Sequence, residues 1–288
     1  MLLNRDLHEE NRLSWNAATE AHNSHKGDQA AYFRAGGNQL YPEERELLGD
    51  VAGLEIVHLQ CSSGQDSLSL AQMGARVTGV DISDVAIEFA RRLSVESGVP
   101  GTFDRMDVYD WLHQCGEAGT KIDVAFCSYG ALCWLSDLEG WAQGIATILR
   151  PGGRFVMVDY HPTLMMFDEQ WNLVYPYFGQ SNYITSDDGV GDYVAVTGGE
   201  LASGSVQERV QNFHNPHPVH EFSWSLADVV TALIDAGLTL ETLREYPYCN
   251  GFRPMQDMVA LPGKRFTVAE GKASVPCMFA VAARKPIA

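Results

Sequence analysis

The stretch that decides the fold is residues 55–64, EIVHLQCSSG, in which a short apolar run is followed by a loop that ends at Gly64. A helical pattern follows and ends at Gly74, and a second apolar run, residues 75–80, ends at Asp81. Short strands that alternate with helices are typical of a parallel sheet with right-handed crossovers. Ligands of such sheets bind beyond the carboxyl ends of the strands, where this loop and Asp81 lie.

The same alternation continues along the chain, so we predict a doubly wound α/β sheet of seven mostly parallel strands. Further strands are predicted over 102–107, 122–127, 155–158, 238–243 and 278–282, of which the last is antiparallel. Further helices are predicted from Ser83 to Gly98, from Ser136 to Leu149 and from Ser225 to Gly237. Ser83 and Ser225 are residues that cap helix N-termini, and glycine is typical of the position after a helix.

Composition excludes several classes of partner. The 288 residues include 37 Asp and Glu against 20 Lys and Arg, which gives a net charge of −17 and a pI near 4.8. Nucleic-acid backbones and anionic membranes need a cationic face, so we expect neither as a partner. The first residues lack the apolar core of a signal peptide. The six cysteines include no C-x-x-C pair, so we expect reduced thiols and a cytoplasmic protein.

Three residues near the predicted strand ends suggest a nucleoside ligand. Gly64 lets a ligand approach backbone N–H groups at a helix N-terminus, and Asp81 can accept both hydroxyls of a ribose. Asp107 follows the third strand and can accept from an adenine amino group. Each residue also has a plainer interpretation: a helix-capping acid for Asp81, a solvated turn acid for Asp107 and an ordinary turn glycine for Gly64.

The order of these elements resembles the class I S-adenosylmethionine-dependent methyltransferases, and the likeness extends over residues 50–160 and 226–283. Four stretches carry it, in order and at normal spacing: residues 57–64, 79–83, 106–108 and 149–154. The first corresponds to the motif V-L-D-L-G-C-G-x-G. This chain departs from it, because Gln60 and Ser62 replace two of the glycines and His58 replaces the acid.

The resemblance implies that S-adenosylmethionine is the cofactor and S-adenosylhomocysteine the product. The residues that it assigns to the cofactor are Gln60, Cys61, Gly64, Asp81, Ile82, Asp107, Val108 and Ser128. A nicotinamide-dependent oxidoreductase is the alternative, since it also uses a glycine loop and an acid after the second strand. The loss of two glycines hinders the close approach of a diphosphate more than it hinders a phosphate-free ligand.

The segment between the fifth and sixth strands is predicted to form the acceptor site. Tyr129, just past the fourth strand, and Trp171, Tyr175, His220 and Glu221 are its candidate substrate contacts. Aromatic walls with polar tips suit an aromatic or amphipathic small molecule, although the same side chains can simply form a hydrophobic cluster. His161 follows the fifth strand and is a candidate general base, the alternatives being a hydrogen-bonded loop histidine or a transfer without any base.

Two other clusters of side chains each allow a functional and a structural interpretation. Trp15, His22 and neighbouring aromatic residues can cover the sulfonium by cation–π contact, or can simply pack a helix against the sheet. His214, His217 and His220 lie in an extended Pro-rich stretch whose residues alternate faces, so we expect no metal site.

We therefore predict four segments: an N-terminal helical lid over 1–50, a cofactor-binding core over 51–160, a substrate-binding insertion over 161–225 and the rest of the core sheet over 226–288. The predicted function is methyl transfer to a small molecule, by a monomer or homodimer. A non-catalytic cofactor-binding module and a fold that uses the sulfonium for another reaction, such as a cyclisation, remain alternatives.

Overall fold

The structure is a computed structural model that describes residues 3–179, 183–197, 201 and 209–287. Its centre is a seven-stranded sheet in the order β3-β2-β1-β4-β5-β12-β8. These strands are β1 (Glu55–Leu59), β2 (Arg76–Asp81), β3 (Thr102–Arg105), β4 (Ile122–Ser128), β5 (Leu149–Tyr160), β8 (Thr239–Tyr246) and β12 (Met278–Arg284). The predicted sheet is confirmed: the pairs among β1 to β5 are parallel, and β12 is antiparallel to both of its neighbours.

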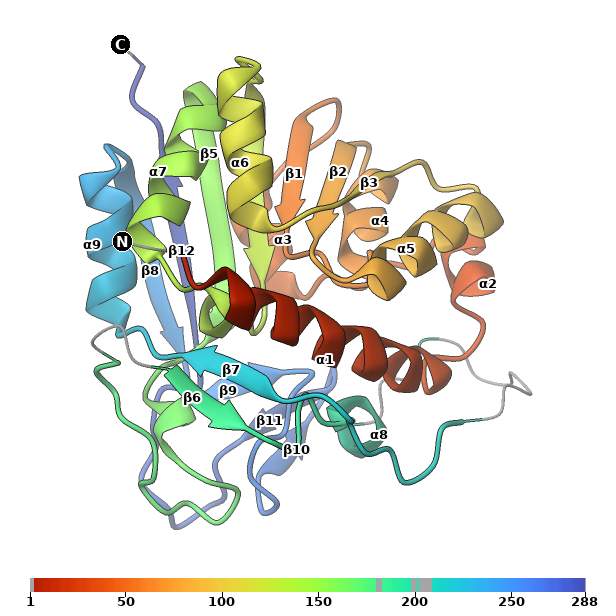
Figure 1. Cartoon of the computed structure of the whole chain (residues 1–288), viewed down its shortest axis with the longest axis vertical. Helices are drawn as coiled ribbons and strands as arrows, with labels where there is room; N and C mark the ends of the chain where they lie inside the picture. Colours follow the sequence, from red (N-terminus) through yellow and green to blue (C-terminus); the bar gives the residue numbers. More distant parts are fainter. Residues whose placement is uncertain (1–2, 180–182, 198–200, 202–208, 288) are drawn as a thin grey trace.

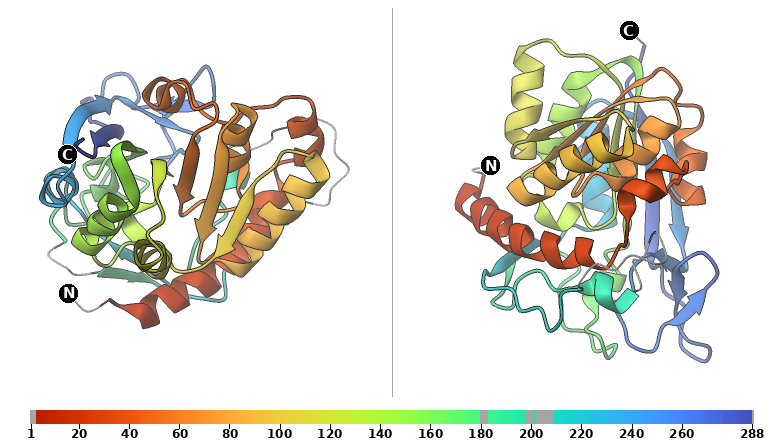
Figure 2. Two further views of the ribbon diagram at one scale, coloured as in Figure 1. Left: turned by 90° about the horizontal axis from the view of Figure 1, so that it is seen from above. Right: turned by 90° about the vertical axis from the view of Figure 1, so that its right-hand side faces the viewer.

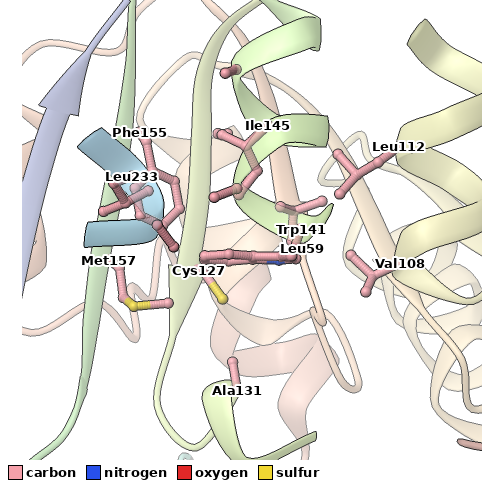
Figure 3. Close-up of a cluster of buried hydrophobic side chains, with 14 of the residues drawn as sticks. Leu59, Val108, Leu112, Cys127, Ala131, Trp141, Ile145, Phe155, Met157 and Leu233 are labelled. Atoms are coloured by element: carbon pink, nitrogen blue, oxygen red, sulfur yellow. The ribbon is translucent and has the colours of Figure 1, made fainter. Parts of the chain in front are cut away.

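Helices cover both faces of this sheet. One face carries α6 (Val108–Glu117), α7 (Leu138–Ile148) and α9 (Leu226–Asp235), and the other carries α3 (Pro42–Leu48) and α4 (Gln65–Gln72). Next to α4, α5 (Asp84–Ser97) packs against the short helix α2 (Gln29–Arg34). Figure 3 shows the core on the first face, where the fully buried Trp141 lies edge-on to Phe155 with ring centroids 5.3 Å apart.

The longest helix, α1 (Arg5–Ser24), crosses the carboxyl ends of the strands. Figure 1 shows it between the sheet and a lower layer, and the views in Figure 2 agree. That layer holds the hairpin β6 (Tyr183–Ser186) and β7 (Val219–Phe222), the short helix α8 (Tyr193–Thr197), and a small sheet of β9 (Tyr248–Asn250), β10 (Val259–Leu261) and β11 (Arg265–Thr267). Two 3-10 turns, η1 (Leu132–Trp134) and η2 (Leu164–Met166), complete the described elements.

The N-terminal segment differs from its prediction in one respect. Helix α3 lies within the segment predicted as a lid, with Pro42 at its first turn, but Leu47 and Leu48 pack it onto the sheet. The helix that lies over the strand ends is α1, whose buried face is largely polar and so gives no apolar stripe at helical spacing.

Other differences are local. Ser225 caps α9 as predicted, whereas the cap of α7 is Asp137 and not Ser136, because the Asp137 carboxylate accepts from the Gly140 amide. Helix α6 and the small sheet of β9, β10 and β11 were not predicted. No helix in the described part of the chain is both long and apolar enough to cross a membrane.

Candidate functional site

The loop between β1 and α4 takes a left-handed backbone at every second residue. The φ angles are 54° at Gln60, 47° at Ser62 and 77° at Gly64. These are the three glycine positions of the methyltransferase motif, and two of them hold residues for which a left-handed backbone costs about 1 kcal/mol. The loop therefore has the conformation that glycine favours even where glycine has been replaced.

Hydrogen bonds from β2 hold this conformation. The Ser62 amide donates to Asp81 Oδ2 at 2.8 Å, the Ser83 amide donates to Asp81 Oδ1 at 2.8 Å, and the Cys61 amide donates to the Val80 carbonyl at 2.9 Å. Burial raises the pKa of Asp81, although the backbone amides partly offset this effect. On the other side, the Gln60 side-chain amide donates to the Ala131 carbonyl at 2.8 Å and ties the loop to the end of β4.

Gly64 has a packing role in this loop. It precedes α4, and a Cβ at this position would lie 2.7 Å from Ala90 Cβ and 2.7 Å from Phe103 Cε1. Gly64 does not line the cavity described next, and its predicted contact with a ligand stays a prediction.

A first cavity of about 290 Å³ runs along the carboxyl ends of the strands. It is lined by seven of the eight residues predicted to bind the cofactor: Gln60, Cys61, Asp81, Ile82, Asp107, Val108 and Ser128. Tyr129, predicted to contact substrate, lines it as well. The structure thus brings the predicted cofactor residues together from the ends of β1, β2 and β4 and from the segment after β3.

At one end of the first cavity, Asp107 caps α6 and accepts from the Tyr109 amide. Its other oxygen lies 2.7 Å from Nδ1 of His8, whose Nε2 lies 2.8 Å from the Ser136 hydroxyl. Burial raises the pKa of Asp107, but the hydrogen bonds from His8 and Tyr109 outweigh it, so the net pKa lies below its usual value. His8 was not predicted, because it lies 99 residues from Asp107 in the chain.

The other end of the first cavity holds two oppositely charged groups that sequence reasoning missed, Lys26 and Asp66. Burial lowers the pKa of Lys26 to about 8 and raises that of Asp66, and each group counteracts the shift of the other. The Ser128 hydroxyl lies 3.3 Å from Asp66 Oδ2 and 3.3 Å from His58 Nε2. Burial lowers the pKa of His58 to about 3, so this imidazole, in place of the motif's acid, is neutral.

Helix α1 supplies the wall of the first cavity opposite the strand ends, through His8, Asn11 and Trp15. The Ser83 hydroxyl donates to Asn16 Oδ1 at 2.6 Å and fixes α1 to the start of α5. Of the predicted aromatic cover, Trp15 lines the cavity, whereas His22 lies behind it, 6.0 Å from Trp15 between ring centroids.

A second cavity, of about 880 Å³, lies in the layer below α1 and shares Gly130, Tyr193 and Thr197 with the first. Its walls come from residues 159–177, from α8, from the end of β7 and from residues 252–256. Tyr175 and Glu221, predicted as substrate contacts, line it.

Trp171 and His220, the other two predicted contacts, line neither cavity. The Trp171 indole donates to Asp257 at 2.6 Å. His220 joins the β6–β7 hairpin to α1: the Asn11 amide group pairs with both backbone groups of His220, at 2.8 and 2.7 Å, and the ring contacts Thr185. His220 therefore holds the layers together.

His161 also lines neither cavity. Its Nδ1 accepts from the Thr163 amide at 3.1 Å, and its Nε2 lies 2.9 Å from Glu245 Oε1 on β8. The plainer alternative, a histidine hydrogen-bonded within the protein, describes this arrangement, and a general-base role for His161 stays a prediction. Within the described residues, no group of three or more His, Cys, Asp or Glu side chains is arranged to hold a metal ion.

Comparisons with known proteins agree with this geometry. Residues 56–153 match the family described as "Methyltransferase domain". The chain is 34% identical over 106 residues to a "Ubiquinone biosynthesis O-methyltransferase" of Cupriavidus pinatubonensis, and 33% identical over 119 residues to the "S-adenosyl-L-methionine-dependent Diels-Alderase iccD" of Talaromyces variabilis. The matches cover 37% and 40% of this chain and only 41% and 40% of those two relatives.

Among solved structures, the chain resembles an S-adenosylmethionine-dependent methyltransferase from Mesorhizobium loti, with a TM-score of 0.54 and 21% identity over 85% of this chain and 96% of that one. A putative methyltransferase from Listeria monocytogenes gives a TM-score of 0.55 and 17% identity over 84% and 96% of the two chains. These two likenesses concern the fold. They show that the chain has the fold of these proteins, and the family match shows a methyltransferase domain over residues 56–153.

The left-handed conformation of Ser62 predicts an unusual response to mutation. Ser62→Gly should raise the free energy of unfolding by up to about 1 kcal/mol, because glycine adopts this φ without steric cost. Ser62→Val should lower it, because a β-branched side chain fits this region poorly. Urea unfolding of the two variants and the native chain measures both; equal destabilisation by both substitutions would contradict the account.

Buried neutral histidines predict acid sensitivity. Burial lowers the pKa of His22 to about 4, while its Nε2 donates to the Gly191 carbonyl at 2.9 Å. Between the ordinary value near 6.5 and this pKa, the unfolded chain binds a proton that the folded chain does not, so stability falls as the pH falls through this window. Urea unfolding at pH 7.5 and 5.5 should show that His22→Gln loses on the order of 1 kcal/mol less than the native chain.

The control for this measurement is His113→Gln, since His113 lies on the exposed surface of α6. Its loss of stability between the two pH values should match that of the native chain. A native-like pH dependence in His22→Gln would show that His22 is not held neutral.

Proposed function

We propose that this protein transfers a methyl group from S-adenosylmethionine to a small-molecule acceptor and releases S-adenosylhomocysteine. One observation carries the proposal: the first cavity joins Asp81, Asp107 and the β1–α4 loop, and it meets a second, larger cavity at Gly130. A cofactor in the first cavity and an acceptor in the second would therefore be neighbours, as a direct transfer requires.

The residues of the first cavity fit each part of such a cofactor. Asp81 would accept from the ribose hydroxyls, and the apolar side chains of Ile82 and Val108 would flank the adenine beside Asp107. At the far end, Lys26 suits the α-carboxylate and Asp66 the α-ammonium of the methionine part, because each carries the complementary charge. The protein places one positive and one negative side chain at this end of the cavity, so the zwitterionic amino-acid part of the cofactor would find a partner for each of its charges.

The bound cofactor supplies a methyl group activated by a sulfonium. The chain's own contribution is positioning and the exclusion of water: α1 forms one wall with Trp15, whose ring lies 5.5 Å from that of Trp134 in an edge-on contact. Aromatic faces stabilise a nearby cation, and a closed cavity removes the water that would compete with the acceptor.

A nicotinamide cofactor fits this cavity less well. A diphosphate needs free backbone N–H groups at the glycine loop, but the Ser62 amide already donates to Asp81. A carboxylate at this point would repel a diphosphate. The likeness to a Diels-Alderase supports a second candidate, a reaction in which the cofactor is bound but its methyl group is retained. Formation of S-adenosylhomocysteine distinguishes the two.

All six cysteines are unpaired thiols in the structure. Free thiols persist in reducing compartments, so we place the protein in the cytoplasm.

Calorimetric titration with S-adenosylhomocysteine tests the proposed function. Asp81→Ala should weaken binding by about 100-fold, because two hydrogen bonds from the ribose to a charged acceptor are lost. Asp81→Asn keeps one acceptor oxygen and should lose about 10-fold. Glu88→Gln, an exposed carboxylate on α5, is the matched control and should bind like the native chain.

Binding of NAD(H) with no measurable affinity for S-adenosylhomocysteine would overturn the proposal. Native-like binding by Asp81→Ala would also do so. Circular dichroism of each variant separates loss of binding from loss of fold, because Asp81 also holds the Ser62 and Ser83 amides.

A further inference from the structure

Five carboxylates line the second cavity, and four of them have partners within the protein. Asp159 accepts from the backbone amides of residues 130–132 and Tyr160, and Asp192 lies 2.8 Å from Nε2 of His25. Asp168 accepts from the side chain of Asn172 at 2.8 Å, and Glu169 accepts from Gln256 at 3.2 Å. These four groups are committed to holding loops in place.

Glu221 is the fifth, and it has no hydrogen bond or ion pair with any part of the chain that the structure describes. Burial raises the pKa of its carboxyl group. Glu221 is partly buried, and a partly desolvated carboxylate without a protein partner gains from a ligand that supplies the opposite charge.

The position of Glu221 on β7 directs its side chain towards η1 and the second cavity. Tyr183 packs on both His220 and Phe222, so these two lie on one face of the hairpin and the alternation of the strand puts Glu221 on the other. Val219, on the same face as Glu221, packs among Ala18 and Trp134. β7 also contacts η1, whose Cys133 has its pKa raised partly by the charge of Glu221.

The rest of the wall is aromatic. Rings from separate segments surround the space, among them Tyr160, Tyr177, Tyr193, Phe222, Trp224 and Phe252. Tyr160 and Tyr193 both pack on Phe252, with centroids 4.7 and 5.9 Å away. Aromatic faces attract cations, and their area suits a flat apolar body.

Arg253 is the one basic side chain in this wall among the described residues. Its guanidinium donates to the Gln256 carbonyl and lies over the Phe266 ring, 6.0 Å from the centroid. It forms no ion pair with Glu221 in the described structure, so the cavity's charge remains negative around an unpaired carboxylate. A carboxylate or phosphate ligand would be repelled here, whereas a cation would be attracted.

We propose that Glu221 anchors a positively charged nitrogen of an aromatic acceptor that occupies the second cavity. This inference rests on the proposed function, since it treats the second cavity as the acceptor site. Glu221 binds the ammonium, the aromatic walls hold the ring body, and the acceptor atom points past Gly130 towards the first cavity. The volume of about 880 Å³ is in the range of cavities that enclose drug-sized molecules.

Three probes with one aromatic body and different charge test the anchor: naphthalen-2-ylmethanamine as the cation, naphthalen-2-ylmethanol as the neutral compound and 2-naphthoate as the anion. Each is titrated calorimetrically into the full chain saturated with S-adenosylhomocysteine. We expect the cation to bind at least 10-fold more tightly than the alcohol, and the anion most weakly. Glu221→Gln should reduce the preference for the cation to within about 2-fold and leave the alcohol's affinity unchanged.

Glu169→Gln is the matched control, because Glu169 lines the same cavity but is exposed and bonded to Gln256. It should keep the preference. A cation that binds no more tightly than the alcohol, a preference that survives Glu221→Gln, or failure of all three probes to bind would overturn the proposal.

The native chain provides a second readout if Glu221→Gln does not fold. The amine stays protonated as the pH is lowered, while burial raises the pKa of Glu221, so this carboxylate loses its charge at a higher pH than an ordinary glutamate. The preference for the cation should therefore fall as the pH is lowered, and the alcohol's affinity should not. The titratable and charged groups that line the second cavity with Glu221 include Cys133, Asp159, Asp192, Tyr193, Tyr177 and Arg253. A preference that is constant with pH would contradict the anchor.

Failure of this inference and failure of the proposed function are distinguishable. Binding of S-adenosylhomocysteine is measured before any probe is added, and it reports on the first cavity. Its absence would count against the proposed function, while a bound cofactor with no preference among the probes would count against Glu221 alone.

Discussion

The hydrogen bond between the Ser62 amide and the Asp81 carboxylate joins the end of β2 to the left-handed loop after β1. Because the loop holds a backbone that Gln60 and Ser62 adopt only at some cost, it needs partners on both sides, which are Asp81 and the Ala131 carbonyl. With the loop held by these two contacts, the first cavity lies along the strand ends. The proposed positions of the ribose and of the methionine part depend on it.

The helix α1 closes this arrangement by directional contacts more than by apolar packing. His8 bonds to Asp107, Asn11 pairs with the backbone of His220, and the Asn23 amide donates to Ser63 at 2.8 Å. Polar contacts of this kind fix orientation, because a buried polar group without its partner is costly. The same helix therefore touches the cofactor residues, the hairpin and the β1–α4 loop, and it sets how the acceptor layer meets the core.

The sheet, and the meeting of the proposed cofactor residues at one edge of it, could be predicted from sequence, because strand ends in a parallel sheet must converge and short-range motifs mark them. His8 and Lys26 could not, since they lie in a polar segment far from their partners. Only the spacing of the polar residues 8, 11, 19 and 22 suggests a buried helical face. Trp171 and His220 are residue types that are common in substrate sites, but their side chains form hydrogen bonds within the protein. Glu221 was predicted as a substrate contact together with them, but its carboxylate has no such partner among the described residues. No sequence pattern reveals this difference.

A crystal structure of the full chain with S-adenosylhomocysteine tests the central claim most directly. The account predicts both ribose hydroxyls within hydrogen-bond distance of the Asp81 carboxylate, the amino-acid part between Lys26 and Asp66, and the sulfur facing the second cavity past Gly130. A ligand bound elsewhere, or one whose ribose lies away from Asp81, would contradict it.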